Sequence, residues 1–213
     1  MPGPTKNTDI LLNQAVSSIP RNIPALATTW DPVNILDPAT STASHYLASD
    51  AGAGAGAACG RFTAIGSYEF IGGVVAGVSR ENGGPYTNGG IAIHNGTNVY
   101  EAGRHSDVVF VSGATYSYTT GYRSGFHSYS QDGLGMTGPV HVAWRKDGSN
   151  WTWGWSMDGV AWRWSTLALA ITPTHYGVVL AADGPKGAVW VTHLLACASA
   201  AEYAAAIPTA FGG

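Results

Sequence analysis

The chain has 213 residues, a length that suits one β-sandwich with an extension better than two very small domains. Charged residues make up 11% of the chain and its formal net charge is −3, so neither long charged helices nor the basic surface that binds nucleic acid is expected. We find no apolar run of the length that a membrane span needs, and no secretory signal pattern at the start of the sequence. We therefore expect no nucleic acid and no membrane as partner, and no export by the general secretory route.

The first part of the sequence, residues 1–58, is predicted to be an irregular N-terminal arm for assembly. It is rich in proline, and its one helix-like stretch, Thr8–Ser18, has too few apolar residues to build a core. It ends in alternating alanine and glycine at 51–58, which is typical either of a flexible linker or of an extended strand that another backbone approaches closely. The remainder, 59–213, is predicted to be the sandwich domain with a short C-terminal tail.

From Gly60 onward, short β-prone runs alternate with Gly, Asn-Gly and Asp-Gly turns, a pattern typical of an all-β sandwich or barrel. We predict an antiparallel two-sheet β-sandwich with a terminal helical turn at Ser199–Ala206. The predicted strands lie near 61–70, 72–79, 90–95, 97–102, 107–112, 115–123, 139–146, 150–157, 160–166, 176–183 and 187–196.

Two Asp-Gly pairs, at 147–148 and 158–159, predict two-residue hairpins within residues 139–166. This places Trp144 opposite Trp151, and Trp155 opposite Trp162. Because side chains alternate along a strand, one face of the meander then carries every tryptophan of the stretch. These core candidates are Trp144, Trp151, Trp153, Trp155, Trp162 and Trp164.

The tryptophan face has two interpretations: it is the core of the sandwich, or it is an aromatic platform on which sugar rings stack. Leaving so many indoles exposed would create an apolar patch larger than monomers tolerate, which favours the core. The opposite, polar face would then point outward, and we predict ligand contacts there from His141, Arg145 and Arg163, with Thr152 beside them.

A tyrosine-rich stretch is a second predicted ligand contact. Tyr116, Tyr118 and Tyr122, with Tyr129, suit a surface where each ring is partly wet. Packing at a sheet edge is the alternative explanation for these residues.

Two cysteines, Cys59 and Cys197, lie far apart in the sequence. A disulfide between them would close a long loop, which stabilises a fold by restricting the unfolded chain. Two buried free thiols are the alternative, because the sequence gives no sign of an oxidising compartment.

No catalytic or metal-binding motif is evident, so we predict a non-enzymatic protein without metal or cofactor. The glutamates have no acidic partner two or four residues away, as paired-carboxylate glycosidases require, although Tyr68-Glu69-Phe70 ends a predicted strand. The histidines lack the spacing of zinc sites. Calcium bound by Asp107, Asp132 or Asp183 in predicted loops is an alternative. The four glutamates and seven histidines are Glu69, Glu81, Glu101, Glu202, His45, His94, His105, His127, His141, His175 and His193.

The stretch Val142–Trp151 (VAWRKDGSNW), followed by Ser156–Trp162 (SMDGVAW), resembles the central meander of concanavalin A-like lectin/glucanase domains. Tyr176–Ala182 and Ala188–Val191 resemble two later strands of that family, so the resemblance covers about residues 60–197. It implies a jelly-roll sandwich that acts by binding. The second piece also resembles the Asp-box turn of sialidases with the spacing changed by one residue, but we interpret it as a hairpin.

A proline-rich arm on a small glycine-rich sandwich resembles bacteriophage virion proteins, such as capsid decoration, tail and fibre proteins. This resemblance implies other virion proteins and copies of the chain itself, including a trimer, as partners. It also implies assembly in the host cytoplasm and exposure on the virion surface. The alternative is a carbohydrate-binding module for a cell-surface glycan, and a third interpretation is a glycoside hydrolase that depends on Glu69.

Overall fold

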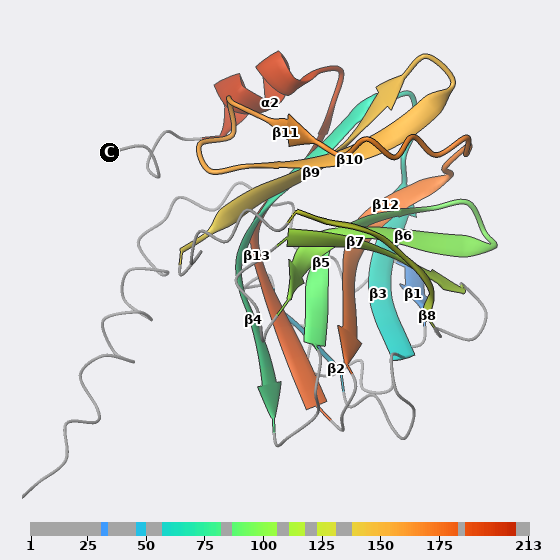
Figure 1. The fold of residues 1–213 in the computed structure, drawn as a ribbon, viewed down its shortest axis with the longest axis vertical. Helices are drawn as coiled ribbons and strands as arrows, with labels where there is room; N and C mark the ends of the chain where they lie inside the picture. The colour runs from blue at the N-terminus through green and yellow to red at the C-terminus, as the bar shows by residue number, and fades with distance from the viewer. Residues whose placement is uncertain are drawn as a thin grey trace, which may run out of the picture.

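The computed structural model describes residues 31–33, 46–49, 57–81, 87–105, 111–117, 123–130, 138–182 and 186–207. Short strands separated by glycine turns dominate this part of the chain, and one short helix follows them (Figure 1). The elements are β1 (Asp31–Val33), β2 (Tyr46–Ser49), β3 (Ala57–Ala64), β4 (Phe70–Glu81), β5 (Thr87–His94), β6 (Asn98–His105), β7 (Val111–Ser117), β8 (Arg123–Ser130), β9 (Val140–Asp147), β10 (Asn150–Ser156), β11 (Arg163–Trp164), β12 (His175–Ala182), β13 (Lys186–Cys197) and α2 (Ala200–Ala206).

The strands form two antiparallel sheets. A seven-stranded sheet has the order β1-β3-β12-β5-β6-β7-β8, and a six-stranded sheet has the order β11-β10-β9-β4-β13-β2. The predicted all-β, two-sheet sandwich is therefore confirmed. The predicted boundaries are wrong between 107 and 123, where β7 occupies Val111–Ser117 and β8 begins only at Arg123.

Two stretches of the predicted arm belong to the sheets. β1 pairs with β3 at one edge of the seven-stranded sheet, and β2 pairs with β13 at one edge of the six-stranded sheet. The end of the alanine–glycine run, from Ala57, starts strand β3. The rest of the arm, with the predicted helix at Thr8–Ser18, lies outside the described residues, so its independence from the sandwich stays a prediction.

The hydrophobic core lies between the sheets. Isoleucine and valine side chains from β4, β5, β12 and β13 pack there against four indoles of β9 and β10. Each of these indoles is at most 4% exposed. Burying rings of this size contributes several kcal/mol each to folding, so the core interpretation holds for these four. They are Trp144, Trp151, Trp153 and Trp155.

The first predicted hairpin is displaced by one residue. Asp147 pairs with Asn150, so the turn is Gly148-Ser149, and Gly148 has φ +60°. Trp144 therefore faces Trp153 instead of Trp151. Moving the turn by one residue shifts the cross-strand partner of every residue by two positions. Since side chains alternate with period two, each residue stays on the same face, and the tryptophans of β9 and β10 still point inward.

The second predicted hairpin is wrong, and its error moves two tryptophans to the other side of the sheet. Asp158 Oδ1 accepts hydrogen bonds from the backbone N–H groups of Val160 and Ala161, both at 2.8 Å, so the chain makes a wide loop and pairs again only at Arg163. Trp164 then faces Gly154. Because the register slips by one residue, the tryptophans of this strand leave the core face and Arg163 joins it.

A second apolar layer, here called the aromatic cluster, covers the outer face of the six-stranded sheet. It comprises the ring side chains of Phe70, Trp162, Trp164 and Tyr203 with Ala143, Cys197 and Ile207. Trp162 and Trp164 stack with centroids 5.3 Å apart, and Phe70 meets both rings edge-on. The helix α2 supplies Tyr203, and in Figure 1 it lies beside β11.

Candidate functional site

The polar face predicted to bind a ligand is not an open surface. His141 is 2% exposed, because α2 covers it and its Nδ1 lies 3.0 Å from the hydroxyl of Tyr203. Arg163 lies on the opposite side of the sheet from Arg145, with its guanidinium 5.3 Å from the ring of Trp155. The prediction that these three side chains share one accessible face is therefore wrong.

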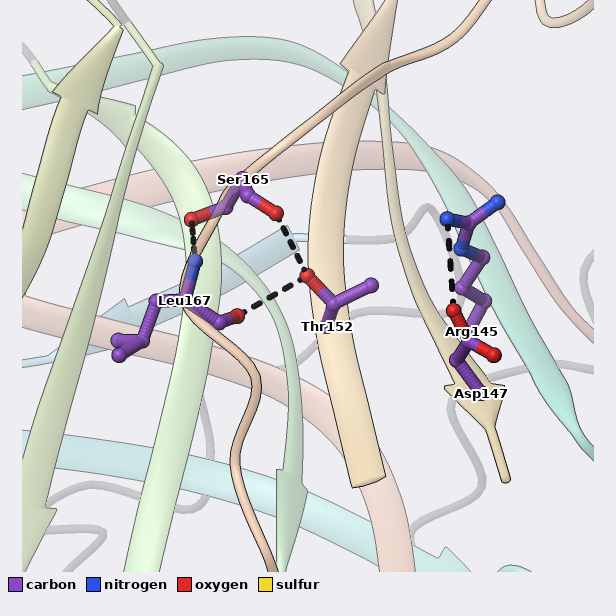
Figure 2. Close-up of polar contacts among 5 residues, drawn as sticks. All are labelled: Arg145, Asp147, Thr152, Ser165 and Leu167. Carbon is purple, nitrogen blue, oxygen red and sulfur yellow. Dashed lines mark hydrogen bonds and ion pairs between the residues drawn. The ribbon is translucent and has the colours of Figure 1, made fainter. Parts of the chain in front are cut away.

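The remaining residues of that face have structural partners. Thr152 Oγ1 lies 3.0 Å from the carbonyl oxygens of both Ser165 and Leu167, so it ties the segment after β11 to β10 (Figure 2). Arg145 covers the ring of Trp164 at 4.1 Å and lies 4.0 Å from the carboxylate of Asp147. Arg145 is the one predicted contact here that stays partly accessible on the outer side, with 39% of its side chain exposed.

The predicted tyrosine contact and the disulfide also differ from the structure. Tyr116 is fully buried instead of partly wet, and Tyr118 and Tyr122 lie outside the described residues. Cys59 and Cys197 are both buried free thiols. Cys59 lies between the sheets and Cys197 lies on the outer side of the six-stranded sheet, so a sheet separates them.

A different set of polar side chains comes together on the outer face of the seven-stranded sheet. We call Asn88, Glu101, His105 and Tyr116 the polar patch. Asn88 of β5 is directly opposite His105 of β6, and Glu101 lies four residues before His105 on the same side of the strand. At about 3.3 Å per residue, the patch extends about 13 Å along β6.

Glycines make the floor of the polar patch flat. Gly90 and Gly103 are paired across β5 and β6, between the Asn88–His105 pair and Glu101. A Cβ atom on Gly103 would lie 2.5 Å from Glu101 Oε1, so the carboxylate lies across this glycine. A Cβ atom on Gly90 would lie 2.2 Å from the carbonyl oxygen of Ala102. The floor therefore accepts no larger residue at either position without moving the sheet.

Glu101 is the central group of the polar patch. It is 0% exposed, and its Oε2 accepts a hydrogen bond of 2.5 Å from the hydroxyl of Tyr116 on β7. The bond fixes the carboxylate over the glycine floor.

The side-chain oxygen of Asn88 is a buried hydrogen-bond acceptor. Its side chain is 2% exposed, and its Oδ1 has no hydrogen-bond partner among the described residues. A buried polar atom without a partner costs about 1–3 kcal/mol, so its presence calls for an explanation. A ligand with a hydroxyl group would supply the missing donor.

Two stacked imidazoles lie on the same face, at the end of β5 and the start of β12. His94 and His175 have ring centroids 4.5 Å apart and an angle of 7° between their planes, and Phe62 meets His94 edge-on at 4.7 Å. His94 is buried, whereas His175 is half-buried. His175 thus presents a flat ring on the same face, with His94 and Val99 between it and Tyr116 in the register.

This side of the seven-stranded sheet combines a carboxylate, an amide, an imidazole and planar rings over a flat floor, the groups that recognise a hydroxyl-rich ligand. The four residues of the polar patch are at most 5% exposed, so this face, like that of His141, is buried in the structure. Sequence reasoning missed it because its residues come from separate strands and form no motif. Only Tyr116 was among the predicted contacts. The alternating pattern of β5, β6 and β7 could have placed these residues on one face, had the registers been known.

Within the described residues, neither a metal-binding cluster nor a membrane-spanning helix is present. No group of three or more His, Cys, Asp or Glu side chains is placed to hold a metal ion there. In that same part of the chain, no helix has both the length and the apolar character of a membrane span. Glu69, the candidate for hydrolysis, forms an ion pair with Lys146 at 2.8 Å.

No family model matches the sequence, and no curated protein matches it. The fold is similar to that of a legume lectin-like domain from Entamoeba histolytica, with a TM-score of 0.50, 8% identity, and coverage of 82% of this chain and 92% of that domain. A protein of unknown function from Saccharomyces cerevisiae gives a TM-score of 0.46 and 18% identity, over 72% of this chain and 88% of that one. The carbohydrate-binding module CBM66 from Bacillus subtilis gives a TM-score of 0.41 and 10% identity, with coverage of 71% of this chain and 94% of that module. The likeness to the legume lectin-like domain shows a shared fold, a lectin-like β-sandwich.

Proposed function

We propose that this chain is a carbohydrate-binding domain and that a glycan binds on the outer face of its seven-stranded sheet, in a state in which the polar patch, at most 5% exposed in the structure, becomes accessible. The observation that carries the proposal is the polar patch, where the acceptor atom of Asn88 has no hydrogen-bond partner among the described residues and the carboxylate of Glu101 is held over a glycine floor. Sugar hydroxyl groups donate and accept hydrogen bonds, so they match a carboxylate, an amide and an imidazole at once. The likeness in fold to a legume lectin-like domain supports this class of ligand.

A glycan array probed with the full chain tests the proposal. The wild-type chain is expected to bind a defined set of glycans, and Asn88→Ala is expected to weaken binding of that set by about tenfold or more, because one sugar hydroxyl loses its acceptor. Arg145→Ala on the other sheet is the matched control and should bind like the wild type. Circular dichroism of each variant shows that the sandwich is intact.

Two results would contradict the proposal. One is a wild-type chain that binds no glycan on the array. The other is an Asn88→Ala variant that binds as tightly as the wild type while Arg145→Ala loses binding, because this would move the site to the six-stranded sheet.

The role in a virion stays a prediction, since most of the arm that motivated it lies outside the described residues. A receptor-binding component of a particle would combine that role with glycan binding. Electron microscopy of an assembled particle is the measurement that tests it.

A further inference from the structure

The helix α2 attaches to the outer face of the six-stranded sheet through Tyr203, with Ile207 directly after its end and Ala200 also in contact with the aromatic cluster. It is seven residues long, and Tyr203 is its buried residue. Ser199 caps its start by accepting a hydrogen bond from the N–H of Glu202 at 3.2 Å, and Glu202 in return accepts one from the N–H of Ala198 at 2.9 Å. A helix this short has little stability of its own, so its position depends on how Tyr203 is held.

The ring of Tyr203 packs among the side chains of the aromatic cluster. A Cβ atom on Gly72 would lie 2.4 Å from its ring, so β4 leaves space there for the phenol. Phe70 and Trp162 flank the ring, with centroids 5.5 Å and 5.7 Å away. The hydroxyl group of Tyr203 lies 3.0 Å from His141 Nδ1.

The ionisable groups that face His141 come from each element packed around it. They are the phenol of Tyr203 on α2, the imidazole of His193 on β13, and the carboxylate of Asp158 in the loop after β10. The backbone of this loop also presses on the ring, since a Cβ atom on Gly159 would lie 3.0 Å from His141 Nδ1. His141 therefore has no room for water, and any charge on it would be buried.

These surroundings favour the neutral imidazole. Burial, and next the neighbouring His193, lower the pKa of His141 from 6.5 to about 4, while Asp158 acts in the opposite direction. Hydrogen bonds from the N–H groups of Ala161 and Val160 lower the pKa of Asp158 to about 2, so that group stays ionised above this pH. Burial raises the pKa of Tyr203, which keeps the phenol neutral.

We propose that α2 is an acid-released latch: mild acidification undocks it from the six-stranded sheet and uncovers the aromatic cluster, while the two sheets stay together. Protonation places a charge on His141, near His193, at a buried aromatic site. Releasing Tyr203 lets water reach that charge.

The sign of the effect follows from the direction of the shift. With the latch closed, the pKa of His141 is about 4, whereas a solvated histidine has 6.5. The released form therefore binds the proton more readily, and docking, strongest above pH 6.5, weakens as the pH falls toward 4. A shift of this size weakens the docking equilibrium by roughly 300-fold in total, or about tenfold per pH unit inside the window.

The two free cysteines provide the measurement. Cys197 lies beneath α2, where its thiol donates to the carbonyl oxygen of Ser199 at 3.3 Å and burial raises its pKa to about 11. Cys59 lies between the sheets and serves as an internal control for opening of the sandwich. The full chain is labelled with 4,4′-dithiodipyridine, which reacts with thiols in acid, and each site is quantified by peptide mass spectrometry.

Between pH 6 and pH 4.5, labelling of Cys197 relative to a free cysteine peptide is expected to accelerate about tenfold per pH unit, with Cys59 protected throughout. His141→Gln, which cannot titrate, should remove this acceleration, and Tyr203→Phe should raise Cys197 labelling already at pH 7.5. His175→Gln is the matched histidine control and should behave like the wild type.

Three outcomes would overturn the latch. Cys197 would stay protected down to pH 4.5; or Cys59 would become labelled in parallel, which indicates global unfolding; or His141→Gln would keep the acid acceleration, which assigns it to another group. Glycan binding on the opposite sheet plays no part in this readout, so each proposal fails or stands separately.

Discussion

Replacing Trp153 with alanine is expected to lower the free energy of unfolding by about 3–5 kcal/mol, whereas Trp164→Ala should lower it by only about 1–2 kcal/mol. Trp153 is 2% exposed between the sheets, so its loss leaves a cavity that rigid neighbours cannot fill. Trp164 is half-buried in the aromatic cluster, where Arg145 and Trp162 cover its ring. Urea denaturation followed by circular dichroism gives both values.

The matched control is Trp153→Phe. Its expected cost is smaller, about 1–2 kcal/mol, because an aromatic ring still fills the space and the indole N–H, which has no hydrogen-bond partner among the described residues, is removed. Equal losses for Trp153→Ala and Trp164→Ala would contradict the split of the tryptophans between two sides of the sheet.

Tyr116→Phe is expected to lower the free energy of unfolding by about 1.5–3 kcal/mol at neutral pH, because the buried carboxyl group of Glu101 loses the hydrogen bond that the Tyr116 hydroxyl donates to it. The test is a double-mutant cycle with Glu101→Gln, which keeps the shape of the side chain and replaces the carboxyl group with an amide. In the Glu101→Gln background, Tyr116→Phe should cost at most about 1 kcal/mol.

The same variants connect stability with glycan binding. If Glu101 contacts a sugar hydroxyl, Tyr116→Phe should also weaken glycan binding, since the carboxylate is no longer fixed over Gly103. A double-mutant cycle without coupling between Tyr116 and Glu101 would contradict the geometry of the polar patch.

Much of the fold was predictable from the sequence, because alternation and glycine turns are local signals. The face of Trp144, Trp151, Trp153 and Trp155 was correct even though the turn moved from Asp147-Gly148 to Gly148-Ser149, since that displacement preserves the alternation. The turn at Asp158 was a different case. There the carboxylate of Asp158 accepts hydrogen bonds from backbone N–H groups and holds a wide loop. The register after the loop is shifted by one residue, so Trp162, Trp164 and Arg163 lie on the opposite face from the one predicted.

The candidate site was hardly predictable for a physical reason. Asn88, Glu101 and Tyr116 meet through the pairing of β5, β6 and β7, and register between strands is a long-range property. The burial of His141 was missed for a similar reason, because the helix that covers it lies far along the chain: Tyr203, through which it docks, is 62 residues away in sequence. Local patterns do not report such contacts.

Mapping a glycan selected on the array onto the 15N-labelled chain by amide chemical shifts tests the central claim most directly. Binding on the outer face of the seven-stranded sheet predicts shift changes concentrated at Asn88–His94, Val99–His105 and Val111–Tyr116. Changes concentrated at His141–Ser156 and Arg163–Leu167 of the other sheet, with the polar patch unaffected, would contradict it.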